Sequence, residues 1–259
     1  MIKVYLKYLF KNPWLYVCSL LVAGTALFEM INRNIGTGNS LFYAQGSTIS
    51  SINTLFYFDF ERKIIALLAA VPFNARFSAE WLSNSNYYII TRKNSTEYLR
   101  SHLIVSCLSS FLVVALGLTI YAVILTANIP IYLDSNEVYM SFGSILEKGY
   151  YTLYIAIKIV IYSLSNTLWC VCGLLCSVFF TNPYIALCSP FIFGFLIENL
   201  TYRFPEYANA FLISAGVAFP EHNLTFQIVY STLFWVIQIS LIGFLFFKYA
   251  RRKIINADS

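Results

Sequence analysis

The chain has 259 residues, of which 59% are hydrophobic and only 11% are charged. Soluble globular domains carry roughly a quarter charged residues, so this deficit, with a mean hydropathy of +0.67, excludes an ordinary soluble domain. In a soluble protein the formal net charge of +5 could indicate nucleic-acid binding. Here the distribution of the charges across a membrane explains it better, and no nucleic-acid partner is expected.

Residues 1–12 place Lys3, Lys7 and Lys11 at i, i+4 and i+8, and apolar residues fill most of the positions between them. This pattern predicts an interfacial helix on the cytoplasmic leaflet with its lysines toward anionic lipid. A signal peptide is the competing interpretation. The apolar run that follows is long enough to span a membrane, which favours the interfacial helix.

Six apolar runs predict membrane spans, and they are residues 13–31, 64–77, 103–127, 150–180, 184–197 and 224–247. The fourth run is too long for one straight span and too short for two. We expect it to form one long helix, straight or bent, with Ser163, Ser165 and Asn166 satisfied inside the bundle. Residues 201–223 are polar at both ends and apolar between, which predicts an outer re-entrant or interfacial segment.

Basic residues are distributed unequally between the two predicted sides. The inside segments contain Lys3, Lys7, Lys11, Arg76, Arg92, Lys93, Arg100, Lys248, Arg251, Arg252 and Lys253. The outside segments contain most of the acids and Arg33, Arg62, Lys63, Lys148 and Arg203. By the positive-inside rule both termini are cytoplasmic. The sequence therefore predicts an all-α integral membrane protein with six transmembrane helices and one permease domain over residues 1–259.

The predicted cytoplasmic coupling segment, residues 78–101, separates two apolar runs. It is mostly basic, and part of it has the pattern of a short amphipathic helix that includes Tyr87 and Tyr88. Asn94 or Ser95 can cap the start of the next helix, so the chain turns here and re-enters the bilayer. A short polar helix at the cytoplasmic end of a bundle can contact a soluble partner and transmit a movement of that partner to the spans.

Sequence motifs for catalysis are missing from the chain. It contains no GxxxxGK[ST] phosphate loop and no HExxH motif, and His102 and His222 fall on opposite sides of the predicted membrane. A Glu-Glu pair with downstream histidines is also missing. The cysteines lie in apolar runs and are interpreted as packing residues. We therefore expect a transport protein that is not an enzyme and holds neither metal nor cofactor.

Lys158 lies about eight residues into the fourth apolar run, roughly 12 Å below the outer boundary at about 1.5 Å per residue. A lysine at this depth costs about 2.5 to 3.5 kcal/mol on insertion scales, so it should pair or face the bundle. Glu29 and Glu198 are the candidate partners, and the three residues could line a transport pathway. The alternative, which the sequence slightly favours, is that Lys158 snorkels to the outer headgroups.

The string FSAEWLSNSNYYIITRKNSTEYLRSH, residues 77–102, and the order of elements around it resemble the membrane subunit of an ATP-binding-cassette type 2 exporter. The resemblance covers nearly the whole chain. It implies a bacterial cell membrane, a second permease copy or a related permease, and two copies of a separate ATPase subunit that binds ATP and Mg²⁺. It also assigns coupling to the ATPase to Glu80, Tyr87, Tyr88, Arg92, Lys93, Glu97 and Tyr98. The alternative for the cations of this segment is that they anchor it to anionic headgroups, and for Lys93 the two roles have equal weight.

The cargo is the least determined part of this prediction. The chain has 23 Phe and 20 Tyr, and an aromatic lining would suit an amphipathic cargo, although aromatic residues also form interface belts. The favoured cargo is an amphipathic antimicrobial or cytolytic peptide, exported by alternating access at a dimer interface. The alternatives are efflux of small-molecule drugs and an ATP-independent secondary carrier that uses Lys158 and a carboxylate as its ion relay.

Overall fold

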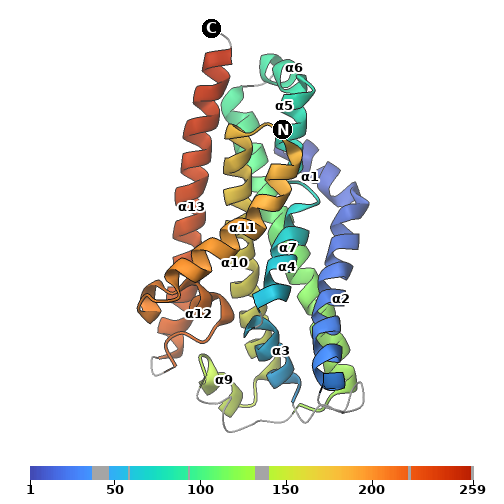
Figure 1. Ribbon diagram of the computed structural model, residues 1–259, viewed down its shortest axis with the longest axis vertical. Helices are drawn as coiled ribbons and strands as arrows, with labels where there is room; N and C mark the ends of the chain where they lie inside the picture. The colour runs from blue at the N-terminus through green and yellow to red at the C-terminus, as the bar shows by residue number, and fades with distance from the viewer. Residues whose placement is uncertain (37–46, 58, 93, 132–139, 221–222, 258–259) are drawn as a thin grey trace.

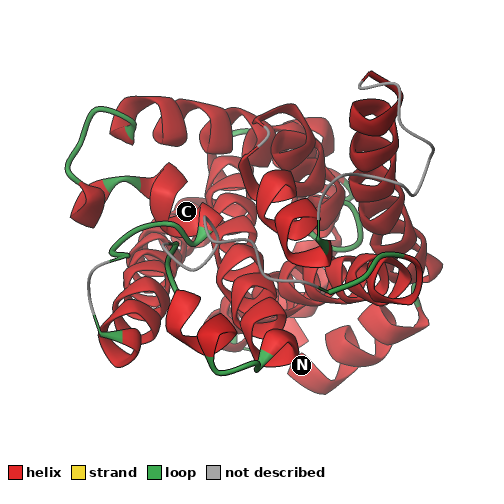
Figure 2. Ribbon diagram, turned by 90° about the horizontal axis from the view of Figure 1, so that it is seen from below, coloured by secondary structure: helices red, strands yellow, loops and turns green. Residues whose placement is uncertain are grey.

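The computed structural model describes residues 1–36, 47–57, 59–92, 94–131, 140–220 and 223–257. Every regular element in these ranges is a helix (Figure 2). The long helices are α2 (Pro13–Gly36), α7 (Ser95–Asn128), α10 (Tyr151–Phe179), α11 (Pro183–Thr201) and α13 (Leu224–Ala257). The shorter ones are α1 (Ile2–Lys11), α3 (Thr48–Tyr57), α4 (Asp59–Ala70), α5 (Ala75–Leu82), α6 (Ser85–Arg92), α9 (Gly143–Glu147), η1 (Glu206–Ala208) and α12 (Ala210–Ala215).

Five helices of the described part are long and apolar enough to cross a membrane. These segments are Pro13–Asn32, Ser95–Asn128, Tyr151–Phe179, Pro183–Thr201 and Leu224–Ile255. The chain is therefore an all-helical protein with the character of a multi-pass membrane protein, as its composition predicts. The predicted count of six spans is not confirmed.

The predicted second span, residues 64–77, is not one continuous helix. α4 ends at Ala70, residues 71–74 form turns, and α5 begins at Ala75. Pro72 explains the break, because proline has no N–H to donate and disfavours the helical conformation of the residue before it. Its carbonyl oxygen accepts a hydrogen bond of 3.0 Å from Asn12 Nδ2. The chain thus passes through this region in short pieces, and none of them is long enough to span alone.

α10 is the central helix of the bundle and confirms the prediction of one long helix. It packs against α4, α7, α11 and α13. In its most apolar stretch 78% of the residues are buried, compared with 17% in that of α13. Ser163 Oγ donates to Ile159 O at 2.7 Å, Ser165 Oγ to Tyr162 O at 2.8 Å, and Asn166 Nδ2 to the same carbonyl at 2.9 Å. These three side chains therefore donate to the backbone of their own helix.

α7 and α13 extend further than the predicted spans. α7 begins eight residues before residue 103, and the Asn94 side chain caps it by accepting from Thr96 N at 3.0 Å. α13 continues ten residues past residue 247. In the predicted re-entrant segment, α12 is a six-residue helix that contacts α3, α10 and α11. Residues 132–139, between the predicted third and fourth spans, lie outside the described residues.

The two ends of the molecule carry different elements (Figure 1). α5, α6, both termini and the C-terminal end of α13 lie at one end, and α3, α9 and α12 lie at the other. We call these the α6 end and the α12 end. Each has a buried glutamate with several partners, and the α6 end contains the predicted coupling segment.

Candidate functional site

Two short helices build the α6 end, and Asn84 makes the turn between them. Asn84 has φ 54°, in the left-handed region that asparagine tolerates better than most residues. Ser83 Oγ bonds the carbonyl of Ala79 at 2.9 Å, and Ser85 Oγ bonds that of Glu80 at 3.3 Å. These serine contacts at the turn satisfy carbonyls at the end of α5 and fix where α6 starts.

Glu80 is the centre of a buried hydrogen-bond network that joins α1, α5 and α7. Its Oε1 accepts from Arg76 Nε at 2.7 Å, and Tyr5 Oη lies 3.0 Å from its Oε2. Tyr98 Oη and His102 Nε2 also lie 3.0 Å from Oε2. Three helices of distant sequence therefore bind one carboxylate, and we call these five residues the Glu80 network.

The network is polar but enclosed. Glu80 is 8% exposed, and Tyr98 and His102 are fully buried. The rings of Tyr5, Phe77 and Tyr98 surround the His102 imidazole with centroid separations of 4.7, 5.3 and 4.7 Å. His102 Nδ1 has no hydrogen-bond partner among the described residues, so the neutral tautomer with the proton on Nε2 fits this site.

The Glu80 carboxylate is held in its ionised form. Burial raises the pKa of this group, but the hydrogen bond from the neutral His102 ring and the hydrogen bond and charge of Arg76 outweigh burial and lower the pKa from 4.5 to about 2. Burial and the neighbouring carboxylate raise the pKa of Tyr5, so its hydroxyl stays a donor. Neither group changes protonation near neutral pH. The network is thus a permanent link between helices at physiological pH.

A second apolar cluster, separate from the main core, supports the same end. It contains Phe77, Tyr98, Leu99, Leu174, Val178, Phe246, Ala250 and Ile254. These residues come from α5, α7, α10 and α13, and Trp81, Ile89 and Ile90 of α5 and α6 pack against them. Lys253 lies at the edge of this cluster and links α13 to α10 and α5. Its Nζ donates to Val178 O at 2.5 Å and lies 4.9 Å from the centre of the Trp81 ring. The coupling segment therefore rests on the ends of three long helices.

The predicted coupling residues fall into an exposed group and a buried group. Tyr87 and Tyr88 on α6 are 60% and 71% exposed, with ring centroids 6.2 Å apart. In contrast, the network encloses Glu80 and Tyr98. Glu97 is partly exposed and accepts from the N-terminal amino group of Met1 at 2.7 Å, which ties α1 to the start of α7.

Two other predicted coupling residues, Arg92 and Lys93, lie at an edge of the described part. Arg92 is the last residue of α6, and its side chain is outside the described part. Lys93 lies outside the described residues altogether. Their pairing with acids on an ATPase stays a prediction.

Two of the predicted pathway residues, Lys158 and Glu198, lie at the α12 end. Glu198 on α11 binds two residues of α4: its Oε1 is 2.7 Å from Arg62 Nη2 and its Oε2 is 2.5 Å from Lys63 Nζ. Arg62 also bonds Ser214 of α12 and donates to Phe56 O at 3.0 Å. We call Arg62, Lys63, Glu198 and Ser214 the Glu198 network. All four side chains are buried.

Lys158 does not snorkel to a headgroup. It is 1% exposed, and its Nζ donates to Ala215 O, at the C-terminal end of α12, at 2.9 Å. The Tyr154 ring lies 5.5 Å away. Glu29 of α2 is also buried. The predicted partner Glu198 is instead engaged by Arg62 and Lys63, both of which the sequence assigned to an outer loop beside water.

The sequence interpretation did not assign Tyr5, Arg76 or His102 to the site. A signal was present, because Arg76 and Glu80 are four residues apart, as are Tyr98 and His102, so each pair shares one helix face. The position of Tyr5 on the helix face away from the lysines was a further signal. Which helices meet could not be read from spacing alone.

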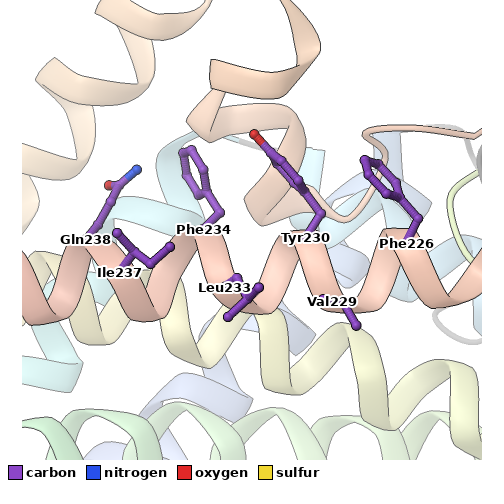
Figure 3. A pocket seen from close by; sticks show the side chains of 7 residues that line it. All are labelled: Phe226, Val229, Tyr230, Leu233, Phe234, Ile237 and Gln238. Atoms are coloured by element: carbon purple, nitrogen blue, oxygen red, sulfur yellow. The ribbon is translucent and has the colours of Figure 1, made fainter.

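An apolar groove on α13 holds about 480 Å³ (Figure 3). The rings of Phe226, Tyr230 and Phe234 follow one another along it, with centroid separations of 5.5 and 6.3 Å. Its lining is almost entirely apolar, and Gln238 lies at one end. Such a surface suits acyl chains or a neighbouring helix and offers no chemistry for catalysis.

Comparisons with known proteins do not identify the chain, since no protein-family model, curated protein or solved structure matches it.

Proposed function

We propose that the chain is the permease subunit of an ATP-driven exporter of the ATP-binding-cassette type 2 kind, with its α6 end in the cytoplasm. The observation that carries the proposal is the pair Tyr87 and Tyr88, two exposed rings on a short helix at the end of the molecule where both termini lie. Exposed aromatic pairs are frequent anchors of protein interfaces.

The contacts beneath α6 supply a route for coupling. A partner that pushes on Tyr87 and Tyr88 moves α6, and α6 packs on the apolar cluster shared with α7, α10 and α13. Through Glu80 the same movement reaches α1 and α7. Glu80 therefore acts as a positioning residue that joins the helices, while the two tyrosines contact the partner. Alternating access then requires a rigid-body movement of these helices relative to a second permease copy.

The partners of this proposal are two copies of a separate ATPase, which binds ATP and Mg²⁺, and a second permease, the same or related. The proposed cargo is an amphipathic peptide, and small-molecule drug efflux is the alternative. Exposed lysines on α1 (Lys3, Lys7 and Lys11) suit the anionic lipid of a bacterial cell membrane.

The test is purification of the tagged chain from its native membranes, followed by identification of co-purified proteins. We expect a soluble ATPase with wild-type chain and at least a tenfold lower yield with a Tyr87→Ala/Tyr88→Ala variant. The matched control is Tyr150→Ala/Tyr202→Ala, which removes two rings of similar exposure at the α12 end. The proposal fails if no ATPase accompanies the wild-type chain or if the Tyr87/Tyr88 variant retains it.

A second candidate, the ATP-independent carrier, is favoured by the buried charges of the Glu198 network and by Lys158. Buried ionisable residues inside a membrane protein commonly mark ion pathways. Vesicles containing only this chain distinguish the two candidates. A carrier moves solute when a proton gradient is imposed, whereas the permease subunit moves none without its ATPase.

A further inference from the structure

A second hollow at the α12 end has different chemistry from the groove on α13. It holds about 380 Å³ and is lined by Tyr57 of α3, Glu198 and Asn199 of α11, Tyr202, and Phe211 of α12. Tyr57 and Tyr202 each meet the Phe211 ring edge to face, with centroids 6.2 and 6.5 Å away. Three aromatic side chains from separate segments thus surround the mouth of a pocket with a carboxylate in its wall.

This combination of groups is the one that binds organic cations. The faces of aromatic rings attract a cation that approaches within about 6 Å of the ring centre, and a carboxylate supplies the opposite charge. Phe211 already binds one cation in this way, because the Arg62 guanidinium lies 4.5 Å from its ring. The pocket is open to the surface through Tyr202, which is 68% exposed.

Glu198 lines the pocket although two cations bind it. Arg62 contacts Oε1 and Lys63 contacts Oε2, whereas a carboxylate has about four acceptor positions. The same two cations repel an incoming positive charge, so removal of Lys63 should strengthen cation binding.

We propose that the pocket formed by Tyr57, Glu198, Asn199, Tyr202 and Phe211 binds an organic ammonium group. This site goes beyond the export proposal and does not depend on it, since the chain alone carries every residue involved. The ammonium can belong to a soluble molecule or to the choline headgroup of a lipid.

The test uses choline as the probe and 3,3-dimethylbutan-1-ol, its uncharged analogue, as the control ligand, with equilibrium dialysis against the purified full chain in detergent. We expect saturable choline binding that the uncharged analogue competes for at least tenfold more weakly. Glu198→Gln should weaken choline binding at least tenfold, and Lys63→Met should strengthen it severalfold.

A variant of an exposed residue tests the pocket without the loss of folding that substitution of a buried residue can cause. Tyr202→Ala removes an exposed ring and should weaken binding about fivefold or more. Tyr184→Ala removes a similarly exposed tyrosine at the start of α11 and should leave binding unchanged. Native mass spectrometry after reconstitution with a phosphatidylcholine and phosphatidylglycerol mixture separates the two sources. If the wild-type chain retains phosphatidylcholine and Tyr202→Ala does not, the ligand is the lipid headgroup. If choline binds but phosphatidylcholine is not retained, the ligand is a soluble cation.

Three results would overturn the proposal. They are no saturable choline binding, equal competition by the uncharged analogue, and equal binding by Tyr202→Ala and Tyr184→Ala.

Discussion

Each end of the molecule contains a buried glutamate, and the two glutamates are stabilised by different kinds of partner. At the α6 end, two tyrosine hydroxyls and a neutral imidazole donate to Glu80, and its one cation, Arg76, is 28% exposed. At the α12 end, two enclosed cations bind Glu198. The free energy of unfolding that is lost when each carboxylate is removed depends on which partner groups are left without it. Hydroxyl groups lose hydrogen bonds, whereas buried cations lose their compensating charge.

The largest expected effect is at the α12 end. Glu198→Ala leaves Arg62 and Lys63 without their shared carboxylate, and breaking such a buried pair typically costs about 3 to 5 kcal/mol. The midpoint of thermal unfolding in detergent measures this cost, and Glu147→Ala, an exposed glutamate at the same end, is the control. If both variants unfold at the wild-type temperature, the Glu198 network does not stabilise the fold.

Acid should remove the contribution of Glu80. Because the folded pKa is lowered from 4.5 to about 2, this contribution is fully present above pH 4.5 and is lost as the pH falls toward 2. The stability difference between wild type and Glu80→Gln should therefore be constant from pH 5 to 8 and shrink below 4.5. A difference that already shrinks between pH 8 and 5 would contradict this assignment.

A smaller effect is expected where α12 ends. Gly216 has φ 62°, and an added Cβ would lie 2.9 Å from Lys158 Cδ. Gly216→Ala should cost about 1 to 2 kcal/mol for the backbone and further stability for displacing Lys158. Gly149 also has a positive φ but open space around it, so Gly149→Ala should cost only the backbone part. Equal unfolding temperatures for the two variants would show that Lys158 is not held tightly at this position.

The smallest effect is the loss of one donor to Glu80. Tyr98→Phe keeps the ring and removes one of several hydrogen bonds, which should cost about 1 kcal/mol. Tyr87→Phe at the exposed surface is the matched control and should leave the unfolding midpoint unchanged. A Tyr98→Phe midpoint equal to that of the control would mean that the remaining donors satisfy the carboxylate fully.

The long elements of the fold could be predicted from the sequence because hydrophobic length alone indicates them. The run over residues 150–180 forms one helix, and Asn94 caps the next helix, where the sequence predicts a cap at residue 94 or 95. The predicted second span differs because Pro72 breaks it and because Arg62 and Lys63 are buried in the bundle. Burial of charge depends on partners that come from distant segments, and spacing does not report them.

The candidate site was predictable only in part for the same reason. The sequence marked Glu80 as unusual because its charge opposes the basic bias around it, but its partner on α1 is 75 residues away. Lys158 was recognised as costly, yet the carbonyl that accepts from it lies at the end of α12, a helix that the sequence indicates only weakly. Tertiary contacts between helices decide both cases.

Hydrogen–deuterium exchange of α1 tests most directly the claim that Glu80 joins α1, α5 and α7 into one unit. In Glu80→Gln, the hydroxyl of Tyr5 loses the charged carboxylate that holds it, so α1 opens more often. A loss of about 1.4 kcal/mol corresponds to tenfold faster exchange in α1, with exchange in the central helix α10 unchanged. Unchanged exchange in α1 of the variant would contradict the account.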